Sequence, residues 1–113
     1  MKVINKTRNI ILATDCSIAA GFWARIKGLL GESSMQKGAA LVLKPCNSIH
    51  SFFMRFTIDA LFIDKNHRVV YPLASLKPFR MSPVFFKASC VIELPAGTLI
   101  PDSVQIGDII SLE

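Results

Sequence analysis

A thiol and an imidazole that could react together lie four residues apart, at Cys46 and His50. A cysteine beside a histidine can act as nucleophile and base, provided that a nearby cation or helix terminus lowers the thiol pKa. A structural zinc site needs four ligands with short paired spacings, whereas Cys16 and Cys90 are distant in the chain. We therefore interpret Cys46 as a candidate reactive thiol and predict no metal site, no cofactor and no assigned catalytic residue.

Four charged residues interrupt stretches that are otherwise apolar: Arg55, Asp59, Arg80 and Glu93. A charge in such a place is costly unless it is paired, so a partly buried network of arginines and carboxylates is one expectation. The alternative is that some of these groups face a cleft, where an arginine could bind an anion with two parallel hydrogen bonds. With His50, these four residues are the candidate ligand-binding residues.

The segment 77–87 alternates cations with aromatic residues in the order KPFRMSPVFFK. Such a segment could bind single-stranded nucleic acid by stacking bases and contacting phosphates. The formal charge of the whole chain is only +5, however, and no block of five like charges occurs. The phenylalanines are therefore expected to plug the open end of a sheet, and nucleic-acid binding is kept as a weak alternative.

Composition favours one compact domain over residues 1–113. With 51% apolar residues, the chain can build a core without disulfides or metals. Polar residues or proline interrupt every apolar run before the 18 or so residues that a membrane-spanning helix needs. The first residues also lack the apolar core of a signal peptide, and three cysteines without C-x-x-C spacing indicate reduced thiols. These features predict a cytoplasmic location.

The apolar pattern predicts a mainly β fold with one helix over residues 17–30. Ile18, Phe22 and Ile26 recur every four residues, Thr14 or Asp15 could cap the helix, and Gly31 could end it. Short apolar runs bounded by turn residues predict strands over residues 2–5, 9–13, 39–43, 49–56, 59–63, 69–71, 89–94 and 109–112. The segment 72–87, which has three prolines, is expected to be irregular. The predicted architecture is a small antiparallel β-sandwich or barrel-like domain with the helix packed on it.

Several short motifs, in this order and spacing, resemble the DUF192 family from about residue 20 to the end. They are Arg25-x-x-Gly28-Leu29-Leu30, Phe52 to Thr57 followed by Asp59, Phe62-Ile63-Asp64, Val91-x-Glu93-Leu94-x-Ala96-Gly97 and Gly107-Asp108. The resemblance implies a small prokaryotic β domain with one packed helix, and it implies no established activity. Many relatives look secreted or membrane-anchored, whereas this chain shows no such leader. The family pattern often carries an Asn and a Pro before the Asp, which the compact stretch here lacks, so no role of that Asn is carried over.

The leading hypothesis is a non-enzymatic domain that binds a small anionic ligand or a protein partner. The predicted site is a cleft bordered by the segments 46–57 and 77–87. The rival hypothesis is an enzyme that uses Cys46 with His50, or a pair of carboxylates among Asp59, Asp64 and Asp108.

Overall fold

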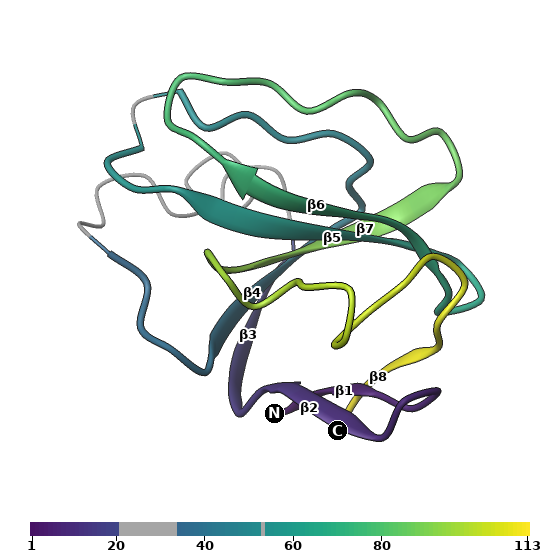
Figure 1. Ribbon diagram of the computed structural model, residues 1–113. Coiled ribbons are helices and arrows are strands. Elements are labelled where there is room, and N and C mark those ends of the chain that lie inside the picture. Colours follow the sequence, from purple (N-terminus) through teal and green to yellow (C-terminus); the bar gives the residue numbers. More distant parts are fainter. Residues whose placement is uncertain (21–33, 53) are drawn as a thin grey trace.

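A computed structural model describes residues 1–20, 34–52 and 54–113 (Figure 1). The strands are β1 (Val3–Asn5), β2 (Ile10–Ala13), β3 (Asp15–Ala20), β4 (Ala39–Lys44), β5 (Ile58–Asp64), β6 (Val69–Leu76), β7 (Ala88–Pro95) and β8 (Ile110–Leu112). They form a three-stranded sheet in the order β2-β1-β8 and a five-stranded sheet in the order β3-β4-β7-β5-β6. No helix occurs in this part of the chain.

The small sheet joins the two ends of the described chain. β1 and β2 form an antiparallel hairpin, and β8 pairs with the other edge of β1. Asn9 has a positive φ of 56° in the hairpin turn, a conformation that Asn tolerates better than most residues. Val3 and Ile110 are buried against the large sheet.

The large sheet is built around β5, whose residues Ile58 to Ile63 are all buried. β5 lies between β6 and β7 and is antiparallel to both. In the turn from β5 to β6, the Asp64 carboxylate accepts hydrogen bonds from the backbone N–H groups of Asn66 and Arg68, at 2.8 and 3.0 Å. The predicted strands 59–63 and 69–71 are therefore joined as a hairpin, and the Asp64 carboxylate stabilises its turn.

Each face of the large sheet carries its own apolar core, because successive residues of a strand point to opposite faces. Leu61 and Ile92 belong to the core between the two sheets. Phe62 and Val91, their neighbours in sequence, belong to a second core on the opposite face. β5 and β7 therefore support two layers at once.

The second core is covered by a layer that we call the ribbon, made of residues 47–52 and 77–87. The two segments run antiparallel: the N–H of Ser82 donates to the carbonyl of Ile49 at 2.9 Å, and the N–H of Ser51 donates to the carbonyl of Arg80 at 2.8 Å. Figure 1 shows both segments above the large sheet, with the small sheet below it. The molecule thus has three layers, namely small sheet, large sheet and ribbon.

The helix predicted over residues 17–30 is wrong at its start. Ser17 to Ala20 belong to β3, which pairs in parallel with β4 from Asp15↔Ala39 to Ala20↔Lys44. Asp15 therefore begins a strand and does not cap a helix. Pairing with the buried β4 outweighs a helical spacing that rests on few residues. Residues 21–30 and the predicted terminator Gly31 lie outside the described residues.

Other expectations also need correction. The parallel β3–β4 pair shows that the domain is not wholly antiparallel, and the described strands form two open sheets and no closed barrel. The predicted strand over residues 49–56 is reduced to a single bridge between His50 and Met81. β6 continues to Leu76, so the irregular segment begins after residue 76 and not at Pro72. The remaining predicted strands are confirmed within one or two residues.

Candidate functional site

The structure divides the candidate residues between the interior and the surface. Asp59 and Glu93 are buried, Cys46 is half-buried, and His50, Arg55 and Arg80 are exposed.

Glu93 lies in the middle of the large sheet, on the face that the ribbon covers. It pairs with Leu41 of β4 on one side and with Ala60 of β5 on the other, so its cross-strand neighbours are apolar. Glu93 is only 4% exposed, and its buried Oε2 has no hydrogen-bond partner among the described residues. Burial raises the pKa of Glu93 to about 7. At neutral pH the group can therefore serve as either a hydrogen-bond donor or an acceptor.

Asp59 points to the opposite face of the sheet, because it is the neighbour of Ala60 in β5. Its Oδ1 accepts the backbone N–H of Ser75 and its Oδ2 accepts the backbone N–H of Leu99, both at 2.8 Å. Ser75 has a positive φ of 60°. Asp59 thus holds two segments against the sheet: β6 at Ser75, where the backbone has this uncommon conformation, and the loop after β7 at Leu99.

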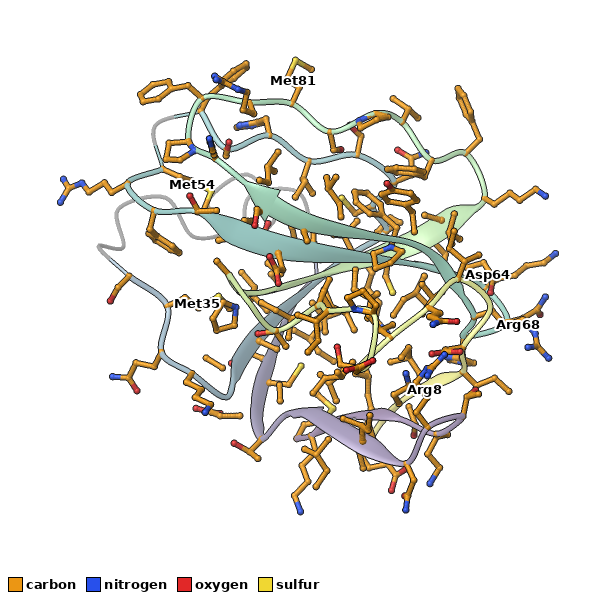
Figure 2. All side chains as sticks on the ribbon, in the orientation of Figure 1. Arg8, Met35, Met54, Asp64, Arg68 and Met81 are labelled. Carbon is orange, nitrogen blue, oxygen red and sulfur yellow. The ribbon has the colours of Figure 1, made fainter. Side chains whose placement is uncertain are left out.

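A second buried carboxylate network, which the sequence reasoning missed, closes the end of the small sheet. Oδ2 of Asp108 accepts hydrogen bonds from Asn5 Nδ2 at 2.9 Å, Arg8 Nε at 2.7 Å and the N–H of Gln105 at 2.9 Å. Burial alone would raise the pKa of Asp108, but these hydrogen bonds outweigh it and hold the pKa below its ordinary value. Arg8 reaches into this end of the molecule in Figure 2. The sequence signal for this network was an Asn at the end of the predicted strand 2–5, because a polar side chain that a strand buries needs a hydrogen-bond partner.

The three aspartates from which a catalytic pair could be formed have separate partners. Asp59 binds backbone N–H groups of β6 and the following loop, Asp64 binds its own turn, and Asp108 binds the small-sheet network. The described contacts bring no two of these carboxylates together.

Cys46 and His50 likewise have separate contacts. The Cys46 thiol donates to the carbonyl of Ser48 at 3.1 Å. His50 Nδ1 accepts the N–H of Phe52 at 3.3 Å, and the two rings stack with centroids 5.3 Å apart. The contacts described for the imidazole are therefore with Phe52. Across residues 1–20, 34–52 and 54–113, no cluster of three or more His, Cys, Asp or Glu could hold a metal ion.

Arg55 and Arg80 do not form the expected network with buried carboxylates. In the described part of the chain the ion pairs are Lys6–Glu113 and Arg8–Asp108, with N–O distances of 3.1 and 2.7 Å. Among the described residues, the Arg80 guanidinium makes one long hydrogen bond, from Nη1 to the carbonyl of Phe79, at 3.4 Å. The cations of the candidate set therefore face outward while its carboxylates face inward.

Three hollows on the described surface are lined by other residues. One of about 550 Å³ lies between β6 and the loop 99–106 and is mostly apolar. A second of about 730 Å³ lies along β2, beside the segments 35–38 and 95–98. A third of about 100 Å³ lies near Lys44 and Cys90. None of the six candidate residues lines these three hollows.

The fold and these contacts define a two-sheet β domain with a covering ribbon and a buried acid between them. The model of the DUF192 family, described as "Uncharacterized ACR", matches residues 3–112. A UPF0127 protein from Pyrococcus horikoshii is 32% identical over 111 residues, which cover 94% of each chain. The chain therefore belongs to the DUF192 family, whose members also carry the name UPF0127, and the predicted resemblance is confirmed.

Two crystal structures share the fold. A Novosphingobium aromaticivorans protein of unknown function matches with a TM-score of 0.83 and 15% identity, covering 98% of this chain and 82% of that one. A Sinorhizobium meliloti protein described as a candidate transcription regulator matches with a TM-score of 0.79 and 19% identity, covering 97% and 89%. At these identities the likeness concerns the fold alone. Over the described residues, no helix is long and apolar enough to cross a membrane.

Proposed function

We propose that this protein is a binding domain for a small ligand that presents an ammonium or other N–H donor to Glu93. The observation that carries the proposal is the buried Oε2 of Glu93, which lacks a hydrogen-bond partner among the described residues. A buried polar atom without a partner costs stability, and such costs are commonly kept where a group serves a ligand.

The surroundings of Glu93 support a ligand with an apolar body. The sheet face beside it carries apolar cross-strand neighbours, Leu41 and Ala60, and the core on this face also contains Met54 and Phe62. A donor group would satisfy Oε2 while the apolar part packs on the sheet, which is the usual division of roles in small-molecule sites. Because Glu93 is 4% exposed, a ligand reaches it only when the covering layer moves.

The proposed ligand differs in charge from the one expected from the sequence: it presents a hydrogen-bond donor to the site and is not an anion. The expectation of an anionic ligand rested on Arg55 and Arg80, and both side chains lie on the surface. The inward-facing group of the candidate set on this face is an acid, so a cationic or N–H-bearing ligand is its chemical complement.

The proposal can be tested with butylammonium as the probe and with butanol and butyrate as matched controls. The readouts are the ¹³C signal of the Glu93 carboxyl, assigned by Glu93→Gln, and the melting temperature at pH 8. We expect butylammonium alone to lower the pKa of Glu93 and to raise the melting temperature, because a bound cation favours the ionised carboxyl. An unchanged pKa, or an equal melting shift in Glu93→Gln, contradicts the proposal.

A further inference from the structure

The outer face of the ribbon exposes a group of apolar side chains. Within residues 79–86, the exposed fraction is 57% for Phe79, 66% for Met81, 48% for Val84 and 88% for Phe86. Met81 extends away from the sheet at the upper edge of the molecule in Figure 2. Single exposed apolar residues are ordinary, but several on one short segment mark an interaction surface.

The pairing inside the ribbon turns these side chains outward. Ser82 is buried, at 6% exposure, and its hydroxyl accepts the N–H of Ile49. Phe85 points toward the sheet, where its ring lies 4.4 Å from that of Phe62, measured between centroids. Since neighbouring residues of an extended segment face opposite sides, Met81 and Phe86 are directed away from the core.

Positive charge gathers on the same segments. The ribbon contains three Lys or Arg residues and no Asp or Glu, so it carries a formal charge of +3 in a chain whose net charge is +5. Lys77, Arg80 and Lys87 are exposed, and none of them forms an ion pair with a described residue. The ribbon therefore presents apolar side chains together with uncompensated cations.

We propose that the outer face of the ribbon docks on an anionic lipid bilayer. Exposed apolar side chains would enter the boundary between headgroups and acyl chains, while the cations contact lipid phosphates. Phe79 and Phe86 have rings on which nucleic-acid bases could stack, but Met81 and Val84 have none, whereas all four side chains can enter a lipid interface. The three described hollows are lined by other residues, so this face offers protruding groups and not one of those hollows. A deformable lipid interface fits such a surface.

Vesicle co-sedimentation of the full chain tests the proposal. The probes are vesicles of phosphatidylcholine with phosphatidylglycerol, and vesicles of phosphatidylcholine alone. We expect binding to the anionic vesicles that weakens as salt is added, because salt screens the attraction of exposed charges. Met81→Ser combined with Phe86→Ser should reduce binding about tenfold or more. The control is Ile106→Ser, because Ile106 is as exposed as Met81, at 65% against 66%, and lies outside the ribbon.

A charge-reversal pair gives a second, independent readout. Arg80→Glu with Lys87→Glu should lower binding about tenfold or more, whereas Lys37→Glu, an exposed lysine outside the ribbon, should leave it unchanged. Unaltered circular dichroism and melting temperatures show that the variants are folded. Absence of binding to anionic vesicles, or an equal loss in the control variants, overturns the proposal. Salt-sensitive retention of polyuridylate without vesicle binding also overturns it, in favour of nucleic acid.

Discussion

The unpartnered carboxyl of Glu93 should make folding stability fall as the pH rises. Its pKa is raised from 4.5 to about 7 by burial, so the unfolded chain releases this proton first. Below about pH 4.5 Glu93 is protonated in both the folded and the unfolded chain, so its titration does not lower the free energy of unfolding. Stability is lost as the pH rises to 7, and above that the loss is about 3 kcal/mol, since each pKa unit corresponds to about 1.4 kcal/mol.

Urea unfolding at pH 5 and pH 8 measures this loss. The comparison is between the native chain and Glu93→Gln, which keeps the shape of the side chain and removes its titration. We expect the native chain to lose about 2 kcal/mol more than the variant between these two pH values, because part of the loss already occurs below pH 5. Asp102→Asn, at an exposed carboxylate, is the control and should follow the native chain. Parallel pH profiles for the native chain and Glu93→Gln would refute the reasoning.

Further predictions concern the other buried groups. Asp108→Ala should lower the free energy of unfolding by about 3 kcal/mol in urea, because three donors lose their acceptor. The pKa of Asp108 is lowered in the folded state, so its stabilising contribution is present above the ordinary aspartate pKa and is lost as the pH falls through the lowered pKa. Asp108→Asn lacks this contribution, so its acid-unfolding midpoint should lie at a higher pH than that of the native chain. Asp59→Ala should cost about 3 kcal/mol by leaving two backbone N–H groups without an acceptor, and a loss below about 1 kcal/mol would contradict this. Burial raises the pKa of the Cys16 and Cys90 thiols, so both should react with iodoacetamide more slowly than a model thiol at neutral pH, which mass spectrometry of the labelled chain measures.

Strands were predicted well where local sequence and burial agree. β5 and β7 are apolar runs bounded by turn residues, and the turn before β8 places Gly107 at a positive φ of 90°, as its residue type favours. The start of the predicted helix failed because β3 is determined by pairing with β4, whose partner residues lie 24 positions along the chain. A short window of spacing cannot report such a pairing.

The candidate site was predicted by residue type but not by orientation. The sequence selects Asp59 and Glu93 as charges in apolar strands, but the contrast between them depends on distant partners. Asp59 receives the N–H groups of Ser75 and Leu99, which are 16 and 40 residues away. Glu93 has apolar neighbours on both adjacent strands, and only the register of the sheet reveals this.

The pairing of β1 with β8 has a consequence for synthesis on the ribosome. Val3 to Asn5 find their partners only at Ile110 to Leu112, and the contact of Asn5 with Asp108 spans 103 residues. A growing chain can form the hairpin of β1 and β2 early, but the small sheet is completed only after residue 112 emerges. Until then, one edge of β1 and the apolar face of the large sheet lack their final cover. We therefore expect nascent chains stalled before β8 to be more sensitive to protease than the released protein.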